Sequence, residues 1–217
     1  MRLLEGLAEL LFPTRCAGCE MPGALLCDTC RDALPLIDRR GHCPRCGAPF
    51  GYLTCTECWN REWAFEAALA LGEFEPPLAR AVVLHKDAGE RRLAAVLGGL
   101  LGNEVSDAWD GWADAVAFVP ATRAALRRRG FDHGFAIANA LADNQGIPLL
   151  RALHRAAALD QRTLGRAARA PPPPRALSPW CPRPARWTRR ARRVWTFAHA
   201  TARARATVKA VKREITT

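Results

Sequence analysis

The chain has 217 residues, of which 49% are hydrophobic and 24% charged, with a formal net charge of +11. This composition is typical of a soluble globular protein. No apolar run approaches the roughly 18 residues of a membrane-spanning helix, and Glu5 and Glu9 interrupt what would be a secretory signal. We therefore expect a cytoplasmic protein without a membrane span.

The positive charge is concentrated in the last third of the chain. Residues 1–150 hold 15 Lys and Arg against 19 Asp and Glu, whereas residues 151–217 hold 17 against 2. A basic segment of this kind binds polyanions through counterion release, whatever its biological purpose. Single-stranded DNA is thus a candidate partner, although the charge alone does not identify one.

Eight of the nine cysteines lie in the first 60 residues and form four Cys-x-x-Cys pairs. The pairs are Cys16/Cys19, Cys27/Cys30, Cys43/Cys46 and Cys55/Cys58. Each such turn places two thiolates on one side of a tight loop, and two turns complete a tetrahedral site for zinc. The spacing suits consecutive pairing, the first pair with the second and the third with the fourth; interleaved pairing stays open.

Three other uses of these cysteines fit the sequence less well. Disulfides need an oxidising compartment, and no export signal is apparent. Iron–sulfur ferredoxins carry a tighter run of cysteines, and a thioredoxin-like redox pair would explain one Cys-x-x-Cys, not four. We therefore predict two Zn²⁺ in closed, structural sites, and treat Cys181 as incidental.

The middle of the chain alternates between strand-like and helix-like segments. Strands are expected over residues 66–74, 115–119 and 147–150, and helices over 78–84, 90–101 and 132–144. This alternation predicts a parallel sheet with crossover helices.

The pattern stops near residue 170. Residues 171–184 contain seven prolines, which remove ladder donors and predict a polyproline linker instead of a buried strand. The final residues 198–214, rich in Ala, Lys and Arg, have helical propensity.

The order and spacing of several motifs resemble the ComF family, in which a double zinc ribbon precedes a phosphoribosyltransferase-like domain. The likeness is carried by residues 11–13, 26–30, 43–47, 84–89, 118–120, 127–132 and 153–164, within roughly residues 1–169. It implies an α/β fold with a flavodoxin-like, phosphoribosyltransferase-type parallel sheet, truncated here, and an association with competence and DNA uptake. The expected domains are a double zinc ribbon (1–60), an incomplete phosphoribosyltransferase-like domain (61–169) and a basic tail (170–217).

The resemblance also implies an anion-binding site. It places Lys86, Arg127 and Arg129 near a phosphate pocket, and their chemistry suits that role because Lys supplies a point charge and Arg a fork of donors. A solvated basic turn over residues 127–129 is the alternative. His133 falls where the family usually has Gln, and we expect it to be a surface or capping residue more than a catalyst.

One expected motif is absent. Phosphoribosyltransferases hold the ribose and its metal with two consecutive acidic residues before a Thr/Gly-rich turn, but no two acidic residues are adjacent in this chain. Either the tail is a divergent extension, or residues from about 170 are translated out of frame or disordered. Mg²⁺ and phosphoribosyl pyrophosphate are thus expected only if the domain is active, and we expect impaired catalysis. The alternative function is a non-catalytic zinc-ribbon module that binds nucleic acid or a competence-machinery protein.

Overall fold

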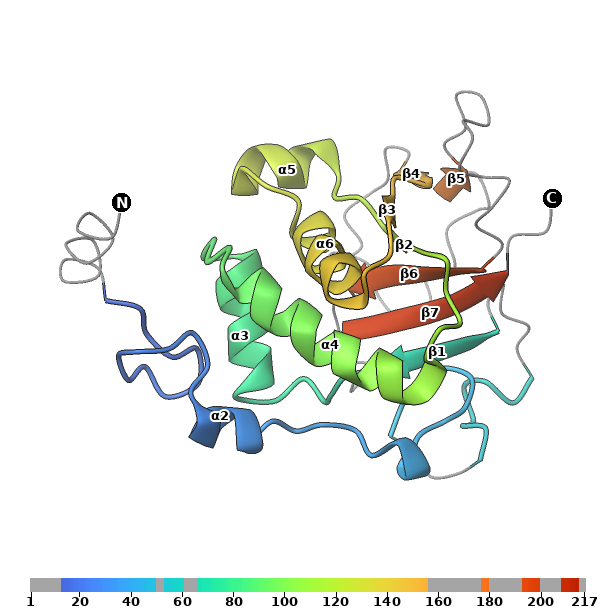
Figure 1. Ribbon diagram of the computed structural model, residues 1–217, viewed down its shortest axis with the longest axis horizontal. Helices are drawn as coiled ribbons and strands as arrows, with labels where there is room; N and C mark the ends of the chain where they lie inside the picture. Colours follow the sequence, from blue (N-terminus) through green and yellow to red (C-terminus); the bar gives the residue numbers. More distant parts are fainter. Residues whose placement is uncertain are drawn as a thin grey trace.

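The computed structural model describes residues 13–49, 53–60, 66–155, 177–179, 193–199 and 208–214. These residues form a mixed α/β domain joined to a cysteine-rich segment (Figure 1). Helices α4 and α6 lie over one face of the sheet in this view, with α3 beside α4, and the cysteine-rich segment runs along the edge of the domain near α3 and β1.

The sheet has five strands in the order β1-β7-β6-β2-β3. Their bounds are Ala67–Ala70 for β1, Val208–Glu214 for β7, Arg193–His199 for β6, Ala115–Phe118 for β2 and Leu149–Leu150 for β3. Strand β2 pairs in parallel with both β3 and β6, and all four of its residues are buried. A second, two-stranded sheet pairs β4 (Leu153–Arg155) with β5 (Leu177–Pro179).

Strand β7 departs from the predicted all-parallel sheet. It runs antiparallel to β6 and to β1. Only residues 200–207 join β6 to β7, and this connection is shorter than the dozen or so residues that a parallel crossover needs. The helix expected over residues 198–214 is therefore wrong at its C-terminal half, and the parallel arrangement is confined to β6, β2 and β3. A flavodoxin-like sheet remains a prediction.

Helices α3, α4 and α6 lie where the periodicity of the sequence predicts helices, whereas α5 was not predicted. Their bounds are Asp28–Asp32 for α2, Leu78–Lys86 for α3, Leu93–Trp109 for α4, Arg123–Arg129 for α5 and His133–Gln145 for α6, with a 3₁₀ turn at Arg39–Gly41. Helices α4 and α6 approach closely at Gly98, where an added Cβ would lie 2.6 Å from Ala140 Cβ. None of the helices within the described ranges is both long and apolar enough to cross a membrane.

The main hydrophobic core extends from the sheet into the first cysteine-rich turn. Cys16, Ala17 and Leu26 are buried in the same cluster as Leu78 and Leu97 of the helices. In contrast, Cys43, Cys55 and Cys58 form a separate small cluster. The first half of the cysteine-rich segment is thus part of the domain core, whereas the second half has a core of its own.

Candidate functional site

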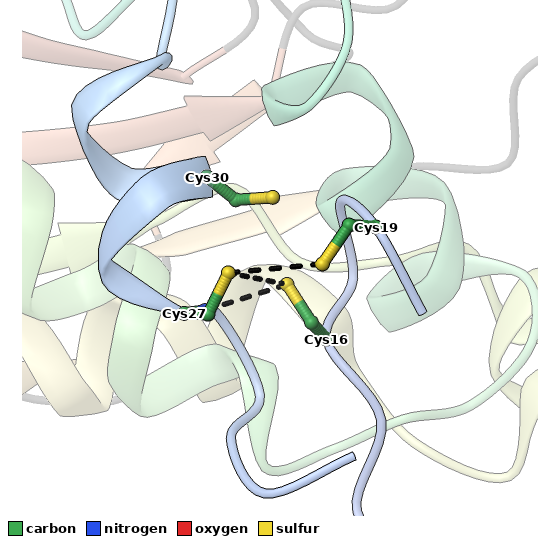
Figure 2. Close-up of side chains that lie close together, drawn as sticks. All are labelled: Cys16, Cys19, Cys27 and Cys30. Atoms are coloured by element: carbon green, nitrogen blue, oxygen red, sulfur yellow. Dashed lines mark hydrogen bonds between the residues drawn. The ribbon is translucent and has the colours of Figure 1, made fainter. Parts of the chain in front are cut away.

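The first four cysteines surround a common centre. Cys16 and Cys19 come from one tight turn, whereas Cys27 and Cys30 come from the start of α2, and their sulfurs face one another (Figure 2). The Sγ of Cys27 lies 3.6 Å from that of Cys16 and 3.7 Å from that of Cys19. All four sulfurs lie within 4.8 Å of one another.

The second four cysteines repeat this construction. In each half, the first cysteine donates its backbone N–H to the carbonyl five residues on: Cys16 to Met21 at 2.9 Å, and Cys43 to Ala48 at 2.8 Å. Cys46 Sγ lies 3.7 Å from Cys55 Sγ, and all four sulfurs of Cys43, Cys46, Cys55 and Cys58 again lie within 4.8 Å of one another. The pairing among the described residues is therefore sequential, not interleaved.

The donor sets fit zinc. Four sulfurs at about 2.3 Å from a tetrahedral ion lie about 3.8 Å apart, which is close to the 3.6 and 3.7 Å seen here. Backbone N–H groups also point at the sulfurs: Cys27 donates to Cys16 Sγ at 3.3 Å, and Cys55 donates to Cys43 Sγ at 3.4 Å. Such donors stabilise thiolates. With four protein ligands, each site would be closed and structural.

The same donors alter the acidity of the thiols. Burial raises the pKa of the Cys16 thiol, but backbone hydrogen bonds from Cys27 and Cys19 outweigh this effect and bring its pKa to about 6. For the Cys43 thiol, burial again raises the pKa, but backbone hydrogen bonds from Cys55 and Cys46 outweigh it and bring the pKa to about 7. Burial and the neighbouring sulfurs raise the pKa of Cys30 to about 12. A divalent cation would therefore have to displace protons from some thiols but not from others.

A second candidate site lies where the end of α3 meets the end of α5. It is a pocket of about 280 Å³ lined by Lys86, Asp87, Ala88, Gly89, Arg128, Arg129 and Phe131. Helix α3 ends in a tight loop in which Asp87 donates its N–H to the Val83 carbonyl, and Gly89 has a φ of +79°. Thr122 caps the start of α5, and Gly130, at a φ of +72°, ends it. Local backbone hydrogen bonds thereby fix the C-terminal ends of α3 and α5, where the pocket lies.

Two of the three predicted anion-binding residues lie together in this pocket. Lys86 and Arg129 both line it, whereas Arg127 is exposed and does not. Arg128 lines the pocket instead. The solvated-turn alternative is wrong for Arg129, whose side chain is only 8% exposed and whose Nη2 lies 3.0 Å from Asp87 Oδ1.

Aromatic and histidine contacts support the pocket wall. The fully buried His85 packs edge-on against Phe131, with ring centroids 5.3 Å apart. Its Nδ1 lies 3.1 Å from the Glu90 carbonyl oxygen. The Arg91 guanidinium lies over the Phe131 ring, 5.0 Å from the ring centroid, and donates a hydrogen bond to the Gly130 carbonyl oxygen. These residues hold the α3–α4 loop against the α5–α6 turn.

Asp132 organises the chain on the other side of Phe131. Its Oδ1 accepts from the N–H groups of Gly134 and Phe135, and so caps α6, while its Oδ2 accepts from the Ala121 N–H at 2.8 Å. The carboxylate therefore ties the loop after β2 to the start of α6. We did not single out Asp132 from the sequence, although an Asp directly before a helical pattern is a capping signal.

His133 is the first residue of α6 and lies next to the pocket cations. Burial, with the positive charges of Arg129 and Lys86, lowers its pKa to about 4. It is therefore neutral at physiological pH. The expected surface or capping role does not describe this residue, because it is partly buried and the side chain that caps α6 is that of Asp132.

Comparison with known proteins identifies the family. Residues 7–59 match the family model of the double zinc ribbon domain, which confirms the predicted ribbon pair. The chain is 30% identical to the DNA utilization protein YhgH of Salmonella typhi, over 74% of this chain and 79% of that protein. The protein of the same name from Salmonella typhimurium matches with the same identity and coverage, and no solved structure matches. The chain therefore belongs to the ComF-like family that includes the DNA utilization protein YhgH.

Proposed function

We propose that the chain acts in DNA utilization, as a ComF-like protein whose α/β domain binds a phosphate-bearing ligand between α3 and α5. The observation that carries this proposal is the convergence of Lys86, Arg128 and Arg129 on one pocket. Three cations from two separate helix ends meet there, and Asp87 is the one carboxylate among the lining residues.

The geometry favours phosphate over a larger ligand. The pocket volume of about 280 Å³ is at the lower end of small-molecule sites, which run from roughly 300 to 1,000 Å³. It suits a phosphate or pyrophosphate group with part of a sugar. The Arg129 guanidinium is nearly fully buried, and a preorganised fork of donors binds phosphate oxygens with little loss of conformational entropy.

We further propose that the domain still binds phosphate but no longer catalyses phosphoribosyl transfer. A phosphoribosyltransferase-like domain is what the family resemblance implies, but the consecutive acidic residues that would hold the ribose and Mg²⁺ are absent from the sequence. Without them, a sugar phosphate would keep its phosphate contacts and lose its metal and hydroxyl contacts. The zinc ribbons are assigned a structural role because four sulfurs leave no open coordination position.

Isothermal titration with inorganic pyrophosphate and with phosphoribosyl pyrophosphate tests this function. Lys86→Met and Arg129→Met should each weaken binding about tenfold, since each removes a charge-assisted contact of about 1.5 kcal/mol. Arg123→Met is the matched control, because Arg123 is exposed at the opposite end of α5 and does not line the pocket. No pyrophosphate should be released from phosphoribosyl pyrophosphate. Equal affinity in the wild type and both pocket variants would refute the proposal.

A second candidate function is binding of single-stranded DNA through the C-terminal charge. The observation in its favour is the excess of 17 Lys and Arg over 2 Asp and Glu after residue 150. Because β6 and β7 belong to the main sheet, deletion of residues 170–217 would damage the domain and test nothing. Substitution of Arg189, Arg190 and Arg192 by Gln is a better test. If these residues contact phosphates, the slope of log affinity against log salt should fall by about 0.7 per lost contact. An unchanged slope would exclude them.

A further inference from the structure

The Asp87–Arg129 ion pair is the central contact of the pocket. Arg129 Nη2 lies 3.0 Å from Asp87 Oδ1, and the two side chains differ greatly in exposure, at 8% for Arg129 and 50% for Asp87. One partner is therefore fixed in the wall of the pocket, while the other lies at its mouth.

A buried guanidinium needs a compensating anion. A largely buried charge that has no opposite charge beside it is costly. Here Asp87 supplies that anion in the absence of ligand. The Nε of Arg129 is also buried, and no hydrogen-bond acceptor for it lies among the described residues. Asp87 therefore satisfies the charge of Arg129 but not all of its donors.

We propose that Asp87 is an internal competitor of the ligand: it occupies Arg129 in the empty pocket and is displaced by an incoming phosphoryl group. This inference rests on the phosphate-binding role proposed above. A half-exposed carboxylate is held by a weak ion pair, and an exposed side chain changes rotamer within nanoseconds. A dianionic phosphate can engage the Arg129 guanidinium through two parallel hydrogen bonds.

The competition makes Asp87 a determinant of ligand charge. A monoanion offers Arg129 no more charge than Asp87 already does, so it should not displace the carboxylate. A dianionic phosphoryl group offers more charge and more acceptors, and it also interacts with Lys86 and Arg128. The pocket should therefore select phosphate and pyrophosphate over monoanions such as acetate.

The test is pyrophosphate binding to Asp87→Asn in the full chain. The variant should bind pyrophosphate about fivefold more tightly than the wild type, the factor that corresponds to the roughly 1 kcal/mol of a partly exposed ion pair. Asp87→Ser should behave alike, which guards against an effect of Asn alone. Asp110→Asn is the matched control for the loss of one negative charge. Asp110 follows the far end of α4, whose 17 residues span roughly 25 Å.

A double-mutant cycle separates displacement from a simple field effect. The gain from Asp87→Asn should fall below twofold in an Arg129→Met background, because the competitor has then lost its partner. A gain of the same size in both backgrounds would show that Asp87 acts only as a nearby charge, and would overturn the inference.

The other outcomes are also decisive. Wild-type binding with no gain in Asp87→Asn would overturn this inference and leave the proposed function intact. No pyrophosphate binding by any of the proteins would reject both. Acetate binding as strong as that of phosphate would contradict the predicted charge selectivity.

Discussion

Arg80 of α3 donates a hydrogen bond from Nη1 to the carbonyl oxygen of Gly18, 3.0 Å away, within the first zinc-binding turn. The same guanidinium pairs with Glu20. Gly18 itself allows this approach, since an added Cβ would lie 3.0 Å from Pro77 Cβ and closer still to Cys30. The helix that ends at the pocket therefore begins on the first zinc ribbon.

The two zinc sites should differ in their effect on the stability of the domain. Cys16 belongs to the main core, whereas Cys43, Cys55 and Cys58 form a separate cluster. We expect Cys30→Ser to lower the free energy of unfolding by several kcal/mol, because loss of a structural metal exposes part of that core. Cys46→Ser should cost the α/β domain about 1 kcal/mol or less. Urea unfolding followed by far-ultraviolet circular dichroism at fixed zinc measures both. Equal losses would contradict the distinction.

Arg80→Met should weaken the junction between the ribbon and α3. The change removes one hydrogen bond and one ion pair, but the Arg80 side chain is 40% exposed, so solvent screens the charge contribution. We expect a loss of about 1 kcal/mol. Arg123→Met, on an exposed part of α5, is the control and should change the urea midpoint little. A loss of stability of the same size in this control would show that the Arg80 contacts make no specific contribution.

Gly47 should tolerate no side chain. Its φ is +69°, and an added Cβ would lie 2.7 Å from the Ala68 carbonyl oxygen and 2.8 Å from the Ala70 nitrogen. The neighbouring strand β1 cannot yield easily, because the contacts are with its backbone. Gly47→Ala should therefore cost about 2 kcal/mol of stability. Gly41→Ala is the control, since among the described residues, its two chain neighbours aside, no heavy atom lies within 4 Å of its added Cβ. Similar thermal midpoints for the two variants would disprove the close approach.

Stability should fall as the pH drops from about 6.5 to 4. Burial, followed by the charges of Arg129 and Lys86, lowers the pKa of His133 to about 4. Two smaller effects come from Asp132, which raises this pKa, and from His85, which lowers it. In the unfolded chain a His titrates near 6.5, so between these values the unfolded state binds more protons and is favoured by up to about 1.4 kcal/mol per pH unit. Burial lowers the pKa of His85 as well, which adds a loss of the same sign.

His133→Gln isolates this contribution. Between pH 7 and pH 5, the variant should lose about 1–2 kcal/mol less than the wild type in urea unfolding. Protonation of the zinc thiolates affects both proteins equally and cancels in the comparison. Parallel losses in the two proteins would show that His133 does not titrate in this window.

Local patterns in the sequence predicted most of the α/β domain. The apolar run that ends at Pro120 is β2, and the period of residues 132–144 matches α6. Strand β7 could not be predicted in this way, because its Lys and Arg content favours a helix. Its conformation depends on pairing with β1, which lies more than one hundred residues earlier in the chain, and with β6, which lies about ten residues earlier. Such non-local contacts override intrinsic propensity.

The lining of the candidate anion pocket was predicted only in part, for a geometric reason. A solvated turn over residues 127–129 was the alternative to an anion-binding role, but these residues form the last turn of α5. On a helix, Arg127 and Arg129 point about 200° apart, so they cannot both face one pocket, whereas Arg128 and Arg129 are only about 100° apart. The family motif therefore indicated a segment that lines the pocket, but not which of its arginines do so. The burial of Arg129 against Asp87 depends on how the end of α5 approaches the end of α3, which local sequence patterns do not encode.

Zinc content tests the central claim most directly. The reduced, folded full-length protein, analysed by native mass spectrometry and by elemental analysis, should carry two zinc ions per chain. Cys30→Ser and Cys46→Ser should each lower this number by one, since each removes one ligand from a different four-sulfur site. Clearly fewer than two zinc ions in the wild type, or loss of both ions from either single variant, would contradict two separate structural sites.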